Sequence, residues 1–107
     1  MATTVDYIEF VCDQIRGLEN VRHKKMFGEY MVYVNDKPIL LVCDNTVYIK
    51  KISELEDLMV NSETGNPYNG AKEHYILDIE DIELVESVVK ILEGVTPLPK
   101  PRKKRTK

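Results

Sequence analysis

The sequence has no tryptophan, only two cysteines and two histidines, and no long apolar run. A membrane-spanning helix needs about 20 consecutive apolar residues, and no stretch of this chain approaches that length. The N-terminus lacks a basic region followed by an apolar stretch, so it is not a secretory signal. We therefore expect a cytoplasmic protein that makes no contact with a membrane.

The scarcity of cysteine and histidine argues against a metal or redox site. Neither Cys12 nor Cys43 belongs to a Cys-x-x-Cys pair, and buried free thiols commonly pack as small hydrophobes. His23 and His74 show no ligand-pair spacing, and surface or strand-edge histidines are the ordinary interpretation. The alternative is a three-ligand metal site in which both histidines meet Cys43. We expect no metal and no cofactor.

Catalytic motifs are also missing. The three serines have no nucleophile-elbow context, and the Gly65–Gly70 spacing lacks the Lys and Ser/Thr of a phosphate loop. Acidic residues gather between Asp78 and Glu83, where carboxylates favour the start of a helix. The sequence therefore predicts that the protein is not an enzyme.

What is present is an ordinary globular composition with an uneven charge. The 107 residues, 43% hydrophobic and 31% charged, suit one domain with a modest core. Residues 1–93 hold all 18 acidic residues and nine of the 15 basic ones, a net charge of −9. The other six basic residues lie in residues 94–107, which contain no acid.

This C-terminal segment differs from the rest of the chain. Pro97, Pro99 and Pro101 exclude a helix and favour an extended chain, and the basic cluster after them has nothing apolar to bury. We expect a folded domain over residues 1–94 and a disordered tail over residues 95–107, dispensable for folding. The tail has three possible roles, which are phosphate contact, neutralisation of the acidic domain, and solubility. The candidate nucleic-acid contacts are Lys100, Arg102, Lys103, Lys104, Arg105 and Lys107.

Capping residues and helical spacing predict three helices. Thr3 or Thr4 caps a helix over residues 4–18 that ends near Asn20 and has an apolar stripe. Ser53-x-x-Glu56 is a capping box and predicts a short helix over residues 53–60. Asp81 caps a helix over residues 81–93 that Gly94 ends. The expected inward residues of these helices are Val5, Ile8, Val11, Cys12, Ile15 and Leu18, then Leu55, Leu58 and Met59, then Leu84, Val85, Val88, Val89 and Leu92.

Alternating and apolar stretches predict an antiparallel sheet. Residues 26–50 form a three-strand meander with turns at residues 35–36 and 44–45, and the charged stretch of residues 21–25 leads into it. Ile39–Cys43 is apolar throughout, as in a strand covered on both faces. Residues 74–79 form a later strand, and a short one lies near Pro67-Tyr68. Together with the helices this predicts a two-layer α+β fold.

The same region carries a family resemblance. Lys24-x-Met26-Phe27-Gly28, a Tyr-bearing strand, an apolar strand with Asp44, and Tyr48-x-Lys50 resemble the N-terminal domain of the TfoX/Sxy family, which regulates natural competence in bacteria. Thr64-Gly65-x-Pro67-Tyr68 resembles the family's middle segment, so the resemblance spans roughly residues 22–92. It implies an α+β fold and a regulatory role.

The chain departs from the family pattern at several positions. Glu29 and Met31 stand where members often carry glycine, and Ile79 stands where they carry proline. A glycine with positive φ replaced by a larger residue costs about 1 kcal/mol or more. Long members also have a C-terminal domain, for which we expect no room here.

Two functional hypotheses remain. The first is a non-catalytic regulatory module that binds an unknown protein partner, or a second copy of itself, through exposed sheet residues such as Met31 and Tyr33. The second is a nucleic-acid-associated protein whose basic tail contacts phosphate. A stacking platform of tyrosines is disfavoured, because a domain of charge −9 repels phosphate.

Overall fold

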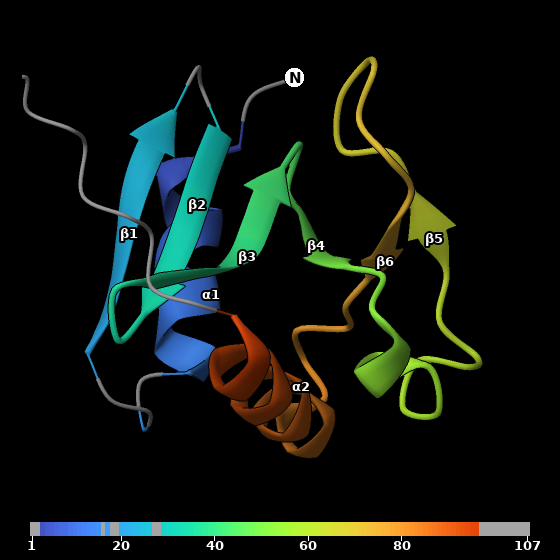
Figure 1. The fold of residues 1–107 in the computed structure, drawn as a ribbon. Coiled ribbons are helices and arrows are strands. Elements are labelled where there is room, and N and C mark those ends of the chain that lie inside the picture. The colour runs from blue at the N-terminus through green and yellow to red at the C-terminus, as the bar shows by residue number, and fades with distance from the viewer. Residues whose placement is uncertain (1–2, 16, 18–19, 27–28, 97–107) are drawn as a thin grey trace, which may run out of the picture.

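The structure, a computed structural model, describes residues 3–15, 17, 20–26 and 29–96. These residues form two α-helices, a short 3-10 helix and a six-stranded antiparallel sheet of order β1-β2-β3-β4-β6-β5 (Figure 1). The fold is α+β, as predicted. Along the chain the elements are α1 (Val5–Gln14), β1 (Val21–Met26), β2 (Glu29–Val34), β3 (Lys37–Cys43), β4 (Thr46–Lys50), η1 (Ser53–Leu55), β5 (Thr64–Gly65), β6 (His74–Ile76) and α2 (Ile82–Val95).

The sheet has one buried face and one half-buried face. Along β2 the side chains alternate strictly, half-buried at odd-numbered positions and buried at Tyr30, Val32 and Val34. Tyr30 pairs with the buried Val42 of β3, which pairs with the buried Val47 of β4, so the alternation continues across the sheet. We call the side with these buried residues the covered face and the other side the open face.

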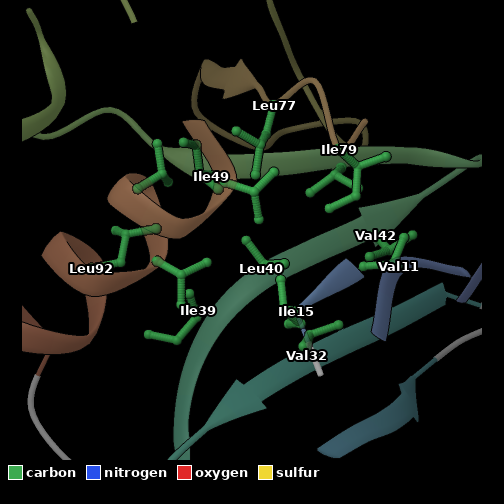
Figure 2. Packing of buried hydrophobic residues seen from close by; sticks show 14 of the residues in the cluster. Val11, Ile15, Val32, Ile39, Leu40, Val42, Ile49, Leu77, Ile79 and Leu92 are labelled. Carbon is green, nitrogen blue, oxygen red and sulfur yellow. The ribbon is translucent and has the colours of Figure 1, made fainter. Parts of the chain in front are cut away.

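Both helices pack on the covered face. From α1, the sulfur of Cys12 lies 3.5 Å from Nδ1 of His23 in β1. At the end of α2, the carbonyl oxygen of Glu93 accepts a hydrogen bond of 2.8 Å from Nζ of Lys37 in β3. Figure 1 shows α1 behind β1 to β3 and α2 below the strands. The helices and strands share one core, of which Figure 2 shows Val11, Ile15, Val32, Ile39, Leu40, Val42, Ile49, Leu77, Ile79 and Leu92.

The two predicted turns are confirmed. Asn35 and Asp36 have φ values of 53° and 66°, and Asp44 and Asn45 have 53° and 54°. Positive φ at both central residues is the type I′ geometry that matches the twist of a hairpin, and Asn and Asp tolerate it better than other non-glycine residues. These turns fix the pairing of β2 with β3 and of β3 with β4.

The start of the meander differs from the prediction. Residues 21–26 are not an entry segment but a full strand, β1, which pairs with β2 from Met26↔Glu29 to Val21↔Val34. The predicted single strand over residues 26–34 is therefore two strands. Phe27 and Gly28, which separate them, lie outside the described residues. β1 is an edge strand whose charged side chains face solvent, so it shows no apolar alternation from which to predict it.

The observed ends of α1 and α2 also differ from the predicted ones: α1 ends earlier than predicted and α2 ends later. α1 is capped by Thr4, whose side chain accepts from the Tyr7 amide, and it ends at Gln14. Val5 is 58% exposed and does not join the stripe, and Leu18 lies outside the described residues. α2 continues through Gly94 to Val95, because one glycine costs a helix only about 1 kcal/mol.

The predicted helix over residues 53–60 is a single 3-10 turn followed by turns. The capping box is absent, since the Ser53 hydroxyl bonds to Glu54 and Ile52 occupies the cap position without a side-chain bond. Leu55 and Met59 are buried as predicted, but Leu58 is 39% exposed.

The later strands are shorter than predicted. The short strand lies at Thr64–Gly65 rather than at Pro67-Tyr68, and β6 ends at Ile76 rather than at residue 79. β6 lies between β4 and β5, so β5 forms the second edge of the sheet. A two-residue edge strand leaves little unpaired backbone for another chain to extend.

The cap of α2 gives a stability prediction. The Asp81 carboxylate accepts a hydrogen bond of 3.2 Å from the Leu84 amide, one of the amides that a helix start leaves unpaired. Asp81→Ala is expected to lower the free energy of unfolding by about 1 kcal/mol in urea denaturation. Glu83→Gln, at an exposed position two residues further along the chain, is the control and should change the free energy of unfolding by less than about 0.5 kcal/mol. Equal losses in the two variants would contradict the role of the cap.

Candidate functional site: the open face of the sheet

The open face carries aromatic, aliphatic and basic side chains and no described helix. Strand register places the residues: Met31 pairs with Leu41, Leu41 pairs with Tyr48, and Tyr48 pairs with Ile76. All of these are half-buried and form a row of large apolar side chains that no helix or strand of the described residues covers, and such a contiguous apolar surface typically marks an interaction site. The open-face residues include Arg22, Lys24, Glu29, Met31, Tyr33, Pro38, Leu41, Cys43, Thr46, Tyr48, Lys50, His74 and Ile76.

A shallow recess lies at the centre of this face. Its volume is about 120 Å³. For scale, a buried apolar cavity of about 150 Å³ accommodates a benzene ring. The recess is therefore sized for one large apolar side chain of a partner. Its lining residues are Met31, Pro38, Ile39, Leu41, Tyr48, Ile49, Lys50 and His74.

Cations and rings surround the recess. The Arg22 guanidinium carbon lies 4.7 Å from the Tyr33 ring centroid, while its Nε lies 3.1 Å from Oδ1 of Asp36. The rings of Tyr48 and His74 meet edge to face at 6.4 Å. Arg22 stacked on an aromatic ring keeps its planar donors available at the edge, as interface arginines do.

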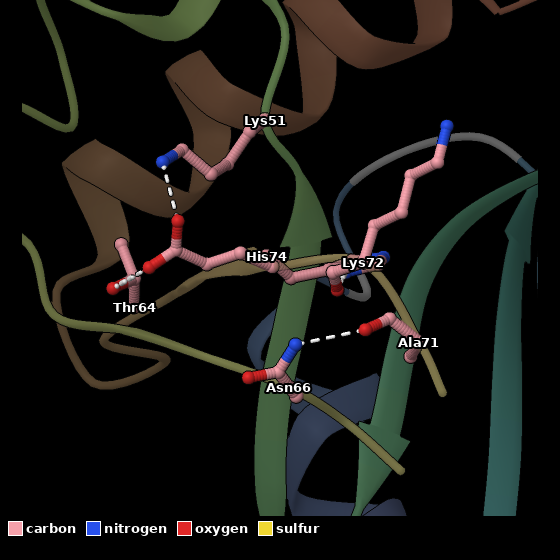
Figure 3. A network of polar contacts seen from close by, with 7 residues as sticks. Lys51, Thr64, Asn66, Ala71, Lys72 and His74 are labelled. Carbon is pink, nitrogen blue, oxygen red and sulfur yellow. Dashed lines mark hydrogen bonds and ion pairs between the residues drawn. The ribbon is translucent and has the colours of Figure 1, made fainter. Parts of the chain in front are cut away.

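A polar network holds β5 and β6 at one end of this face (Figure 3). The Glu73 carboxylate accepts from the Thr64 hydroxyl at 2.6 Å and pairs with Nζ of Lys51 at 3.0 Å. The Thr64 hydrogen bond, followed by Lys51, lowers the pKa of Glu73, and the bond to Glu73 raises the pKa of Lys51. Asn66 Nδ2 donates to the Ala71 carbonyl at 2.8 Å, closing the loop between the two strands. The network therefore positions His74 on β6.

The family-motif positions fall into three groups. Lys24, Tyr48 and Lys50 lie on the open face, with β2 and β3 between Lys24 on β1 and the other two on β4. Asp44 occupies the β3–β4 turn with positive φ, and its amide donates to Oε1 of Glu29 at 3.0 Å. Met26 ends β1 and pairs with Glu29 of β2, and Phe27 and Gly28 lie outside the described residues.

Met31 and Tyr33 of this face were predicted from the sequence as exposed sheet residues, whereas the residues that β1 and β6 contribute were not predicted. Arg22 belongs to β1, which shows no apolar pattern in the sequence. His74 and Ile76 belong to β6, and no local sequence pattern predicts where this strand lies in the sheet. The candidate phosphate contacts in residues 97–107 lie outside the described residues.

The two histidines and Cys43 do not meet. His23 lies on the covered face of edge strand β1, with its ring 5.4 Å from that of Tyr30, and its sulfur neighbour is Cys12. His74 lies on β6, and its Nδ1 is 2.7 Å from the Lys72 carbonyl oxygen. Among the described residues no three His, Cys, Asp or Glu side chains are arranged to hold a metal ion.

The acidic run at residues 78–83 has local roles. Asp78 Oδ1 accepts from the Glu80 amide, and Asp81 caps α2. In the part of the chain that the structure describes, no helix is both long and apolar enough to cross a membrane.

Cys43 gives a pH-dependent prediction. Burial, then the negative charges of Glu29 and Asp44, raise its pKa to about 11. At pH 8 roughly one thiol in a thousand is then the reactive thiolate, and the side chain is only 3% exposed. Burial also raises the pKa of Cys12, but that side chain is half-buried. We expect iodoacetamide at pH 8 to modify Cys12 first and Cys43 only in denaturant, with the Cys43 rate rising as the pH approaches 11. Equal modification of both in the native protein, by peptide mass mapping, would contradict this.

Comparison with known proteins gives two findings. Residues 13–86 match the family described as the TfoX N-terminal domain. The chain is also 37% identical over 109 residues to an uncharacterised 12.7 kDa protein encoded in the trpE 5′ region of Spirochaeta aurantia, covering 100% of this chain and 95% of that protein. No solved structure matches.

Proposed function

The chain belongs to the TfoX N-terminal domain family, and we propose that it is a non-catalytic, cytoplasmic regulatory module that binds a protein partner through the open face of its sheet. The observation that carries this proposal is the apolar recess between half-buried side chains, on a face that no helix of the described residues covers. Binding energy at protein interfaces concentrates in a few buried anchors that fill such recesses.

The charges around the recess favour one kind of partner segment. Lys24 and Lys50 are exposed on the open face, and Arg22 is exposed beside them. A segment with one large apolar side chain and acidic neighbours therefore matches the face in both shape and charge. This basic surface contrasts with the net charge of −9 over residues 1–93.

The thiols support a non-catalytic role. A cysteine nucleophile needs a lowered pKa, whereas burial raises the pKa of Cys12 and raises that of Cys43 to about 11. Both therefore remain protonated near neutral pH. This is the environment of packing residues rather than of activated nucleophiles.

Charge reversal on the open face tests the proposal. The full chain and its Lys24→Glu/Lys50→Glu variant are used to capture proteins from the native cell after nuclease treatment. We expect the wild-type chain to retain a defined partner and the variant to retain at least about tenfold less, since two attractive contacts become repulsive.

The matched control is Lys25→Glu/Lys90→Glu. It makes the same change in net charge at two exposed residues, one of them on β1 and one on α2. The control should retain the partner. Loss of the partner in both variants would indicate a general charge effect and would overturn the assignment to the open face.

A second copy of the chain is the other occupant that the sequence predicted. Two open faces meeting about a twofold axis would bury both recesses, and such symmetric dimers are the commonest homo-oligomers. Sedimentation of the purified chain at high micromolar concentration separates the cases. A purely monomeric protein excludes self-association and leaves the protein partner.

The alternative function, contact with nucleic acid through the tail, rests on the six basic residues of the last 14. Nuclease treatment and salt dependence distinguish it from protein binding, because phosphate contacts release counterions and lose affinity steeply with salt.

A further inference from the structure

A second surface feature lies on the opposite side of the sheet from the open face. Between the outer side of α1 and the edge strand β1 runs a groove of about 850 Å³, which we call the α1–β1 groove. Phe10 lines this groove and is 38% exposed, and its ring centroid lies 6.2 Å from that of Tyr7. The lining residues are Asp6, Glu9, Phe10, Cys12, Asp13, Asn20, Val21 and His23.

The groove combines exposed apolar surface with negative charge. Asp6 and Glu9 are exposed and form no ion pair with any described residue. No lysine or arginine is among the described lining residues. An occupant of this helix face therefore needs positive charge and some apolar or extended backbone.

The C-terminal end of α2 lies next to one end of the groove. Glu93 Oε2 accepts a hydrogen bond of 3.4 Å from the side chain of Asn35. The Asn35 amide in turn donates to the Asn20 carbonyl at 3.2 Å, and the two side chains bond at 3.1 Å. Asn20 lines the groove. Glu93, three residues before Thr96, is therefore linked to the groove through two residue contacts.

The remaining chain is long enough to occupy the groove. At about 3.1 Å per residue, the rise of the extended form that prolines favour, a segment as long as residues 97–107 can span up to about 34 Å. The ten residues of α1 span only about 15 Å. At this rise Lys100 can lie up to about 12 Å from Thr96 and Lys107 up to about 34 Å, so the reach of the basic residues exceeds the length of α1.

We propose that the α1–β1 groove is the docking site of the chain's own basic segment, residues 97–107. The exposed Phe10 ring offers the segment an apolar surface, and the exposed carboxylates of Asp6 and Glu9 offer negative charge to its lysines and arginines. A docked segment is not free to bind a polyanion, so the groove acts as an internal competitor that salt or a polyanion displaces. Docking of the segment in the groove does not depend on the binding of a protein partner at the open face, and the two are tested by different experiments.

Nuclear magnetic resonance of the full chain tests the docking. The neutral-tail variant Arg102→Gln/Lys103→Gln/Lys104→Gln/Arg105→Gln is compared with the wild-type chain at low salt. We expect amide shift differences confined to α1 and β1, which disappear at high salt and do not change with protein concentration. Differences centred elsewhere, or none, overturn the proposal. Differences that grow with protein concentration show docking on another copy and also overturn it.

Binding of a short duplex DNA probe tests the competition. Asp6→Asn/Glu9→Gln removes two charges from the groove, and Glu83→Gln/Glu86→Gln removes two exposed charges at the equivalent first turns of α2. If the segment is docked about 75 to 90% of the time, its release raises apparent DNA affinity about fourfold to tenfold in the groove variant. The α2 control should stay within about twofold of wild type. Equal increases in both variants, or no increase in the groove variant, overturn the proposal.

Discussion

Leu40→Ala is expected to lower the free energy of unfolding by about 3 to 4 kcal/mol, a large part of the 5 to 15 kcal/mol that stabilises a domain. Leu40 is fully buried at the centre of β3 and pairs with Val32, which is also fully buried. The sheet and both helices share the core around it, so removing three carbons leaves a cavity that no single element can fill. The melting temperature should fall by about 15 to 25 °C.

The control for this variant is Leu58→Ala. Leu58 is 39% exposed, so the same chemical change should cost less than about 1 kcal/mol. Thermal and urea unfolding followed by circular dichroism provide the comparison. Similar losses at the two positions would show that Leu40 is not part of the shared core.

Removal of residues 97–107 is expected to abolish polyanion binding and leave the fold intact. Four of the six basic residues engaged with phosphate give a slope of about −3 to −4 for log K against log salt. A tenfold increase in salt then weakens DNA binding by the full chain about a thousandfold to ten-thousandfold. Binding should be independent of sequence, since reading base edges needs a fixed helix or strand and the three prolines of this segment disfavour a helix.

The truncation is made after Thr96 rather than after Gly94. Val95 still belongs to α2, and the Thr96 amide donates to the Leu92 carbonyl at 2.8 Å, so an earlier cut would damage the helix end. The shortened and full chains are compared for melting temperature and for DNA affinity across a salt series. If the segment is docked about 75 to 90% of the time, its removal costs about 1 kcal/mol and several degrees, so a loss of more than about 10 °C would show that the fold itself depends on the segment. Equal DNA binding would remove it from any contact with nucleic acid.

Elements whose formation depends on local chemistry were predictable from the sequence. Positive φ at Asn35-Asp36 and Asp44-Asn45, the cap at Asp81 and the alternation along β2 all follow from neighbouring residues. β1 was missed because an edge strand buries little and its charges conceal its period. The capping box at Ser53 failed because Leu55 and Met59 reach the core without a regular helix, so tertiary packing decided the backbone there.

The site was less predictable than the fold. Met31 and Tyr33 were expected to be exposed, because their strand has two unlike faces. Arg22 and Ile76, however, join them only through the strand order β1-β2-β3-β4-β6-β5. The position of β6 between β4 and β5 depends on pairing across about 25 residues, and no local pattern encodes it. The recess depends on this strand order, because residues of β2, β3, β4 and β6 line it.

Site-specific photo-crosslinking in the native cell tests the central claim, that the open face binds the partner, most directly. A photoreactive phenylalanine analogue replaces Tyr33 on the open face in one form of the full chain and Val60, which is 74% exposed on the η1 side, in another. The account predicts a crosslinked protein of defined mass from position 33 and none from position 60. Crosslinking from position 60 with none from position 33 would contradict it.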